Sequence, residues 1–375
     1  MRVFVSATSI VSGGALNILK QFIINAKPSI EFVIAVNSKV ELESKYTEQE
    51  NISFIRIVEN SRLDRVQWDF WRAKQEITKL KCRINLVISL QNTTLNVGNI
   101  PQVVYVHQGI FLHDQPWNPL IASERKYAFY KYVYPRFIFA FSRASTQYVV
   151  QTEWMRKALM QKYNVPQENV FNIKPDIVYW DEKNKDYSSE CIEDKTLLLF
   201  YPATGELFKN HLLVLNAIRY LHNSTKKLNK MLNLRVIFTL NVSSESNVHI
   251  HNYLNENPNI KKYCEFTGPI SYEQVKSFYD SCHAVTFPSS IESFGLPLLE
   301  AAMLGKKILS LNTSFAREVL DGYEGVEFIE HNSKMWANSI SGLSNNGRFH
   351  TARFVPKYKT SWHDFFELIT KNEYV

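Results

Sequence analysis

The sequence predicts an α/β protein built from two doubly wound domains. Short apolar runs alternate with amphipathic helical stretches along most of the chain, which is typical of parallel sheets covered by helices on both faces. The alternation stops in a polar, aperiodic stretch at 176–194 and then starts again. The chain has 375 residues, which is more than one ordinary hydrophobic core accommodates, so we expect two domains.

The first half of the chain supplies the strands and helices of the first domain. A turn with two glycines follows the opening apolar run, and residues 15–24 then have the pattern of a helix. Residues 66–81 are also helical in pattern. Residues 139–163 are typical of a strand, a short loop, a second strand and a helix. The other expected strands of this half are 2–7, 31–38, 52–58, 84–91 and 101–108.

The second half repeats the alternation from residue 196 onward. Residues 270–282 are expected to be a helix, because Ser271 suits its N-cap and Gln274 completes a capping box. The other expected helices are 211–222, 296–304, 316–322 and 361–372. The expected strands are 196–203, 234–241, 283–290, 306–312 and 325–330. The predicted parts are a first domain at 1–178, a linker at 179–194, a second domain at 195–358 and a C-terminal helix at 359–375.

The composition limits the class of protein. Apolar residues make up 45% and charged residues 21% of the chain, which is typical of a globular protein and not of a disordered one. The net charge of +7 suggests a nucleotide, a nucleic acid or a membrane surface as partner. The four cysteines lie far apart, which favours a reduced, cytosolic protein over a zinc protein. No signal peptide is apparent, and no run reaches the roughly 18–20 apolar residues that a bilayer requires.

Residues 287–305 contain two glutamates, Glu292 and Glu300, with seven residues between them. Glu292 precedes an expected helix, and Glu300 lies about one turn inside it. A carboxylate at Glu300 could accept hydrogen bonds from vicinal hydroxyls, such as those of a ribose. On the spacing alone, an ordinary strand–turn–helix unit with two solvated acids fits at least as well.

The same stretch also predicts an anion site at the start of this helix. Pro297 suits the first helical turn, and Gly305 suits the end of the helix. The backbone N–H groups of Phe294, Gly295 and Leu296 would then point outward at the positive end of the helix dipole. A phosphate group binds well in such a place.

Three further stretches place candidate residues directly after expected strands, where ligands bind in doubly wound domains. Lys209 and Asn210 precede a helix, and the lysine could pair with a phosphate; otherwise it is a solvated loop lysine with Asn210 as N-cap. Gly13 and Gly14 allow a ligand to approach a helix N-terminus, although a simple turn fits equally well and the G-x-G-x-x-G motif is absent. His107 follows VVYV, and a lone histidine there is either a site residue or structural.

Taken together and in this order, these stretches resemble the signature of retaining, nucleotide-sugar-dependent glycosyltransferases of family 4, which have the GT-B fold. The resemblance is carried by FPSSIESFGLPLLEAAMLGKKILSLNTSFAREVL, by FKNHLLVLNAI, by EFTGPISYEQVKSFYDSCHAVTFPSS and by the glycine pair. It covers most of the chain and is most specific over residues 264–320. It implies two Rossmann-like domains facing across a cleft, with the C-terminal helix packing back on the N-terminal domain.

The resemblance also implies roles for individual residues. Glu292, His107 and Lys209 would form the catalytic set: Glu292 and His107 would contact the donor sugar, and Lys209 would neutralise the leaving diphosphate. Glu300 would bind the donor ribose. No metal or other cofactor is expected, and the chain contains no Asp-x-Asp motif. The remaining expected positions are Ser293, Phe294, Gly295, Leu296 and Asn210 on the donor side, and Gly13 and Gly14 on the acceptor and diphosphate side.

One departure from the family concerns phosphate binding. Many members carry an arginine a few residues before the lysine, whereas this chain has Glu206 and no arginine in TGELF. The strength of phosphate binding is therefore open. This form of the segment is similar to a subgroup of bacterial O-antigen and polysaccharide transferases.

The function implied by the resemblance is transfer of a sugar from a nucleotide-diphosphate sugar to a glycan or lipid-linked acceptor in bacterial surface polysaccharide or lipopolysaccharide synthesis. Basic and aromatic residues in 124–157 suit an anionic membrane surface, so we expect peripheral contact at the cytoplasmic face of the inner membrane. Alternatively, those aromatics pack on the sheet. No nucleic-acid recognition module is present.

Two other classes of function stay open, a GT-B sugar-nucleotide epimerase and a non-catalytic GT-B binding subunit. The sequence does not specify the donor base or sugar, the acceptor, the linkage or the oligomeric state.

Overall fold

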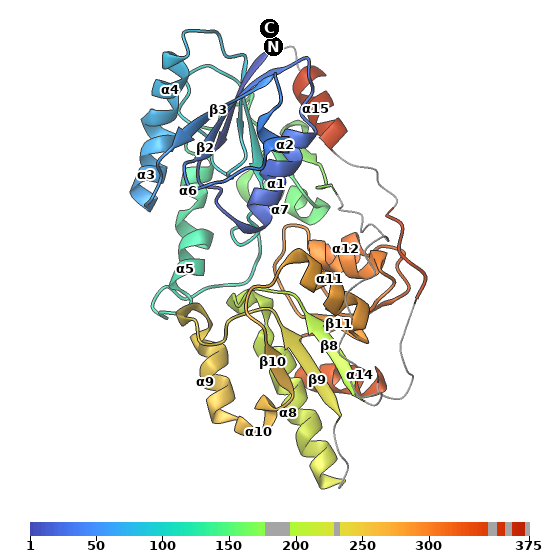
Figure 1. The fold of residues 1–375 in the computed structure, drawn as a ribbon. Helices are drawn as coiled ribbons and strands as arrows, with labels where there is room; N and C mark the ends of the chain where they lie inside the picture. The colour runs from blue at the N-terminus through green and yellow to red at the C-terminus, as the bar shows by residue number, and fades with distance from the viewer. Residues whose placement is uncertain (177–195, 229–232, 344–350, 357–361, 372–375) are drawn as a thin grey trace. The chain divides into compact units, whose positions relative to one another are not determined.

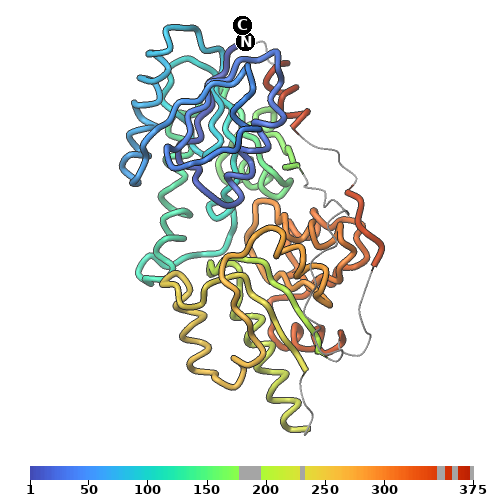
Figure 2. Tube along the Cα trace, viewed as in Figure 1, coloured from blue at the N-terminus to red at the C-terminus, as the bar shows by residue number. Residues whose placement is uncertain are grey.

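The computed structural model describes residues 1–176, 196–228, 233–343, 351–356 and 362–371. The chain divides into two compact units (Figure 1, Figure 2), one made of Met1–Ile177 with Tyr358–Val375 and the other of Val178–Lys357. Each unit contains a parallel sheet with helices packed against it, which confirms the predicted class of two Rossmann-like domains. The predicted linker at 179–194 lies outside the described residues.

The sheet of the first unit has seven strands in the order β3-β2-β1-β4-β5-β6-β7, and all pairs are parallel. The strands are β1 (Arg2–Ala7), β2 (Glu31–Asn37), β3 (Ile52–Ile57), β4 (Leu86–Ser89), β5 (Gln102–Val106), β6 (Gln147–Val150) and β7 (Val170–Asn172). The helices are α1 (Gly13–Ile24), α2 (Ser44–Thr47), α3 (Arg62–Gln67), α4 (Ala73–Lys79), α5 (Arg125–Ala128), α6 (Pro135–Ile138), α7 (Glu153–Tyr163) and α15 (Trp362–Lys371), with π turns η1 (Trp68–Arg72) and η2 (Phe129–Val133) and the 3-10 turn η3 (Gln167–Asn169).

Both faces of this sheet are buried. Val3 and Val5 of β1 belong to a hydrophobic cluster with residues of α1 and α15. Phe4, which points to the opposite face, packs in a second cluster with Trp68 and residues of α4. Burial on both faces explains why Val3, Phe4 and Val5 are all apolar rather than alternating with polar residues.

The C-terminal helix α15 is part of the core of the first unit. The rings of Trp362, Phe365 and Phe366 are buried and lie 5.4–6.1 Å from the ring of Phe22 in α1, measured between centroids. Trp362 Nε1 also donates a hydrogen bond to Gln21 Oε1 at 2.9 Å. A segment at the far end of the chain therefore completes the first hydrophobic cluster.

The predicted helix at 66–81 contains the π turn η1 (Trp68–Arg72) between α3 and α4. A π turn disturbs the regular backbone bonds of a helix and often marks a functional region. Here Asn96 accommodates the disturbance: its N–H bonds the carbonyl of Asp69 at 2.8 Å, and its side chain donates to the carbonyl of Phe70 at 3.0 Å. The Asp69 side chain is buried as a result.

The second unit has a sheet of six parallel strands in the order β10-β9-β8-β11-β12-β13. The strands are β8 (Leu197–Tyr201), β9 (Leu234–Phe238), β10 (Cys264–Phe266), β11 (Ala284–Phe287), β12 (Lys307–Leu311) and β13 (Val326–Ile329). The helices are α8 (His211–Lys227), α9 (Val248–Glu256), α10 (Pro258–Lys261), α11 (Tyr272–Ser281), α12 (Leu296–Met303), α13 (Ser314–Val319) and α14 (Ser333–Leu343), with 3-10 turns η4 (Leu207–Lys209) and η5 (Glu245–Asn247).

Several local predictions for this unit are confirmed. Ser271 Oγ accepts from the N–H of Gln274, and the Gln274 side chain accepts from the N–H of Ser271, which is the predicted capping box. Helix α12 has Pro297 in its first turn. Gly305 follows the end of α12 with a φ of +68°, a left-handed conformation that favours glycine.

The strand expected at the start of 139–163 is wrong. Pro135 begins the short helix α6, and the chain then makes a turn that ends before β6. Phe139 and Phe141 are apolar because their rings fill gaps between elements: Phe141 lies 4.8 Å from the Phe70 ring, and Phe139 lies 4.8 Å from the Tyr163 ring. Strands β7 and β10 were also missed, since three residues are too few to show a hydrophobic period. Helix α9 was missed as well, although its buried Ile250 and Leu254 have helical spacing.

We expect Trp362→Ala to lower the free energy of unfolding of the first unit by about 3–5 kcal/mol, because it leaves a large cavity in a buried cluster. Trp71→Ala is the matched control in the same unit, since this side chain is 48% exposed, and it should cost less than about 1 kcal/mol. Urea unfolding followed by circular dichroism measures both. Equal losses in the two variants would show that α15 is not part of the core.

Candidate functional site

Two loops of the second unit meet at the carboxyl edge of its sheet. They follow β8 and β11, which are neighbouring parallel strands, so both loops leave the same edge. The N–H of Ser290 donates to the carbonyl of Phe208 at 2.8 Å, and the Asn210 side chain donates to the carbonyl of Pro288 at 2.9 Å. Two segments that are distant in sequence are thereby fixed against each other.

Lys209 and Glu292, one from each loop, form an ion pair. Lys209 Nζ lies 2.5 Å from Glu292 Oε1, and the two side chains are only 16% and 14% exposed. The carbonyl of Lys209 is held by the hydroxyl of Tyr201 at 2.7 Å. The structure therefore brings together two of the three predicted catalytic residues, and neither is a freely solvated surface group.

The start of α8 does not match the alternative in which Lys209 is a solvated loop lysine and Asn210 is the N-cap. Lys209 ends the 3-10 turn η4, and Asn210 adopts a left-handed conformation with a φ of +52°. The Asn210 side chain makes no N-cap hydrogen bond, and its amide NH₂ donates to the Pro288 carbonyl. Asn210 thus joins the two loops rather than capping α8.

Helix α12 begins directly after the Glu292 loop. Gly295 precedes it with a φ of +90°, so an L-amino acid with a side chain would be strained there. The ring of Phe294 is buried, and Leu296 is the first helical residue. Ser293 is partly buried in the same turn. Pro297 has no N–H, and the N–H of Leu298 donates to the carbonyl of Gly295 at 2.9 Å, so the N–H groups of Gly295 and Leu296 are the donors that this turn can offer an anion.

Glu300 lies in the second turn of α12 and is not a solvated acid. The hydroxyl of Tyr279 donates to Glu300 Oε2 at 3.3 Å and to the carbonyl of Pro297 at 3.1 Å. Burial raises the pKa of Glu300 to about 7, although the hydrogen bond from Tyr279 opposes the shift. Near neutral pH this carboxyl group is therefore close to half ionised.

The predicted residues of the first unit lie at the carboxyl edge of its own sheet. His107 directly follows β5, and burial together with the charge of Arg65 lowers its pKa to about 4, so the imidazole is neutral near pH 7. Gly13 and Gly14 begin α1 and are exposed; Gly13 has a φ of +66°, and no atom lies within 4 Å of a Cβ built at either. These residues belong to a different unit from Lys209, Glu292 and Glu300.

The sequence prediction missed a buried polar segment at 91–94, the residues QNTT that follow β4. Gln91 Oε1 accepts from the N–H of Ser9 at 3.0 Å, and Gln91 Nε2 donates to Ser6 Oγ at 2.6 Å. Asn92 contacts His107. Four polar residues directly after an apolar strand were a signal that could have directed attention to this loop.

Arg65 and Asp69, on α3 and η1, form a second ion pair beside this loop. Their closest atoms are 3.3 Å apart, and the side chains are 15% and 4% exposed. Arg65 also donates to the side chain of Thr93. Burial raises the pKa of Asp69 to about 6, while the positive charge of Arg65 lowers it. The pair fixes the polar loop to the neighbouring helix.

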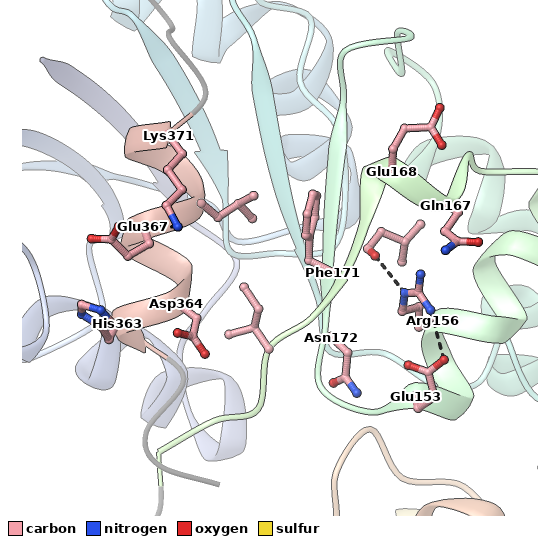
Figure 3. Close-up of a pocket in the computed structure, with 13 residues that line it drawn as sticks. Glu153, Arg156, Gln167, Glu168, Phe171, Asn172, His363, Asp364, Glu367 and Lys371 are labelled. Carbon is pink, nitrogen blue, oxygen red and sulfur yellow. Dashed lines mark hydrogen bonds and ion pairs between the residues drawn. The ribbon is translucent and has the colours of Figure 1, made fainter.

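A cavity of about 940 Å³ lies elsewhere in the first unit, between α15 on one side and α7 and β7 on the other (Figure 3). Arg156 spans part of its wall, bonded to Glu153 and to the carbonyl of Val170. None of the candidate site residues lines this cavity. Within the described ranges, no group of three or more histidine, cysteine or acidic side chains is arranged to hold a metal ion.

Comparison with known families gives a partial match. Residues 182–355 match the family described as Glycosyl transferases group 1. The D-inositol 3-phosphate glycosyltransferase of Paenarthrobacter aurescens (strain TC1) is 32% identical over 76 residues, which is 20% of this chain and 19% of that protein. The aligned stretch thus spans only about a fifth of the length of this curated relative.

Solved structures share the fold over the whole chain. WaaG, a glycosyltransferase involved in lipopolysaccharide biosynthesis, has a TM-score of 0.68 at 14% identity, covering 99% of this chain and 100% of that one. Anabaena Alr3699/HepE in complex with UDP and glucose has a TM-score of 0.63 at 13% identity, with 99% of both chains covered. The UDP-GlcNAc 2-epimerase from Methanocaldococcus jannaschii has a TM-score of 0.56 at 13% identity, covering 99% and 100%. The predicted GT-B fold is therefore shared with solved enzymes, and residues 182–355 are similar to the glycosyl transferases group 1 family.

Proposed function

We propose that the protein is a retaining glycosyltransferase of family 4, which moves a sugar from a nucleotide-diphosphate sugar to a glycan or lipid-linked acceptor. The observation that carries the proposal is the pairing of Lys209 with Glu292 beside the start of α12, inside the matched domain. A cation, a hydroxyl-binding carboxylate and a helix N-terminus are the groups that a sugar diphosphate requires.

In this proposal the donor lies along the edge of the second unit. Lys209 leaves Glu292 and pairs with the diphosphate, whose other oxygens accept from N–H groups in the first turn of α12. Glu292, released from the lysine, binds a hydroxyl of the donor sugar. Glu300 lies deeper in α12 and accepts hydrogen bonds from the ribose hydroxyls. His107 is proposed to contact a sugar hydroxyl, and Gly13 and Gly14 to leave room for the acceptor and the diphosphate.

The transfer replaces one bond to the anomeric carbon by another. The bond to the diphosphate oxygen breaks and the nucleoside diphosphate leaves with the electron pair, while the acceptor hydroxyl forms the new glycosidic bond on the same face and passes its proton to an oxygen of the departing diphosphate. Negative charge grows on the leaving oxygen, and Lys209 with the α12 N-terminus stabilises it. The proposed transfer does not require a metal ion bound to the protein. Glu206, which interacts with Thr204, adds no positive charge, so we expect modest diphosphate affinity.

The acceptor side of the proposal includes contact with an anionic membrane. Leu120 and Ile121 are 85% and 44% exposed, and the exposed cations Arg125 and Lys126 follow them. Apolar side chains beside basic ones suit the headgroup region of a bilayer. Of the aromatics expected at this surface, Tyr127 is buried instead. None of the described helices is long and apolar enough to span a bilayer. The exposed apolar and basic side chains at 120–126 are the support for the proposed lipid-linked acceptor.

An epimerase is the second candidate, favoured by the fold shared with the UDP-GlcNAc 2-epimerase. The two are separated by incubating the protein with the nucleotide sugar that gives the largest thermal shift in a panel, with and without lipid-linked and free glycan acceptors. Release of nucleoside diphosphate only with an acceptor supports transfer. A new sugar nucleotide formed without acceptor supports epimerisation, and binding without turnover supports a non-catalytic subunit.

We expect Glu300→Ala and Glu292→Ala to affect different steps. Glu300→Ala should weaken donor binding about 10- to 100-fold, because it removes charge-assisted hydrogen bonds to the ribose. Glu292→Ala should chiefly lower kcat, by about 10- to 100-fold, because its sugar contact strengthens during transfer. Calorimetry and initial-rate kinetics measure the two effects, with the exposed Glu324→Ala as control. Donor affinity and rate like those of the wild type in both variants would refute the proposed site.

Donor affinity should rise with pH around neutrality. Only the ionised Glu300 accepts from both ribose hydroxyls, and its ionised fraction grows as the pH passes its raised pKa of about 7. Between pH 6 and pH 8 the affinity should therefore increase by roughly three- to tenfold. Calorimetry with an intact nucleotide sugar measures this, since its phosphates do not titrate in this range. The Glu300→Gln variant should show a flat profile; the same slope in that variant would assign the effect to another group.

A further inference from the structure

Asn92 contacts His107 through both ends of its side-chain amide. Asn92 Oδ1 accepts a hydrogen bond from the backbone N–H of His107 at 2.7 Å. Asn92 Nδ2 lies 3.3 Å from Nε2 of the His107 ring. The contact arises because β4 and β5 are neighbouring parallel strands, so that the residues following them meet at the carboxyl edge of the sheet.

Asn92 itself is held rigidly. Its backbone has a φ of +71°, a left-handed conformation that asparagine tolerates better than most residues, and its side chain is buried. The residues on either side are fixed as well: Arg65 donates to the carbonyl of Gln91 at 3.4 Å and to the Thr93 side chain. A residue in an unusual backbone conformation that is fixed on both sides is typical of a functional site.

The amide determines which ring nitrogen of His107 carries the proton. Since Asn92 Oδ1 already accepts from the His107 backbone, the group facing the ring is the NH₂, which only donates. His107 Nε2 must then be the acceptor, and the proton of the neutral imidazole resides on Nδ1. Arg65 is the charged group that acts on this ring, and with burial it keeps the imidazole neutral by lowering its pKa to about 4.

The Nδ1–H that results has no hydrogen-bond partner among the described residues. Buried donors are rarely left unpaired, because the lost hydrogen bond is not replaced by water. Although Nδ1 is itself buried, His107 as a whole is only partly so, and it lies at the strand ends, where ligands bind in such sheets. An oxygen atom of a bound ligand is the partner that this donor lacks.

We propose that Asn92 is a positioning residue that holds His107 in the Nδ1–H form, so that Nδ1–H donates to a hydroxyl oxygen of the bound sugar. The inference rests on the proposed function, since it takes the ligand to be a sugar. A neutral N–H suits this ligand because a hydroxyl oxygen accepts one hydrogen bond while its own proton remains available to a carboxylate.

Asn92→Asp tests the positioning with the least change in shape. The aspartate keeps the acceptor for the His107 backbone N–H, tolerates the left-handed conformation and replaces the NH₂ by a second oxygen. The His107 proton should then move to Nε2. Two-dimensional NMR of protein with ¹⁵N-labelled histidines, with the His107 signals assigned by substitution, shows which ring nitrogen is protonated. A wild-type ring protonated at Nε2 would overturn the proposal.

Kinetics test whether the proton position matters. Asn92→Asp should lower kcat/KM for the nucleotide sugar at least tenfold and leave the affinity for the nucleoside diphosphate alone within twofold, because only the sugar touches His107. Asn164→Asp is the matched control, since Asn164 is an exposed asparagine with a φ of +51° in the same unit, and it should stay within twofold of the wild type. Wild-type kcat/KM in Asn92→Asp despite a moved proton would overturn the proposal.

Two substitutions of His107 provide an independent check. The amide N–H of asparagine lies near the position of Nδ1, whereas that of glutamine lies near the position of Nε2. His107→Asn should therefore retain at least five times the kcat/KM of His107→Gln. Equal activities or the reverse order would overturn the proposal. Absence of any nucleotide-sugar binding or turnover in the wild-type protein would refute the proposed function instead, while the NMR measurement would still report the position of the proton.

Discussion

The parallel pairing of neighbouring strands is the constraint on which both groups of candidate residues depend. Because β8 and β11 run side by side in the same direction, Lys209 and Glu292 meet although 83 residues separate them. The pairing of β4 with β5 likewise brings Asn92 to His107. In each unit the central strands are buried and mostly apolar, and the candidate polar residues lie where these strands end.

The elements that bury most apolar surface could be predicted from the sequence, and so could single residues at their ends. His107 and Lys209 could be singled out because each follows an apolar run, and Glu300 because it lies within a helix that has Pro297 in its first turn. What could not be predicted were the contacts between loops. Asn92 has a role only because β4 lies beside β5, and that order is set by the packing of the whole sheet. Hydrophobic periodicity also does not predict the left-handed backbone conformation of Asn92 and Asn210.

The carboxyl edges of the two sheets differ in how their polar groups are paired. In the first unit Gln91 bonds both Ser6 and Ser9, so these polar groups are paired within the protein. A buried network of this kind fixes geometry and leaves few groups for a ligand. In the second unit the central pair, Lys209 and Glu292, consists of two groups that a ligand could separate. The carboxyl edge of the first sheet holds the His107 imidazole in place. At the carboxyl edge of the second sheet, Lys209 and Glu292 can exchange each other for a ligand.

The ion pair between Lys209 and Glu292 affects which molecules can bind at this site. The two opposite charges already neutralise each other at 2.5 Å. A small anion such as inorganic phosphate could bind Lys209 only by leaving the partly buried carboxylate of Glu292 without a partner, which is unfavourable. A molecule that carries both a phosphate and a hydroxyl group at the right separation satisfies both side chains at once. The ion pair would thus act as a selectivity filter against the abundant simple anions of the cell, before any contact with the base or the acceptor is made.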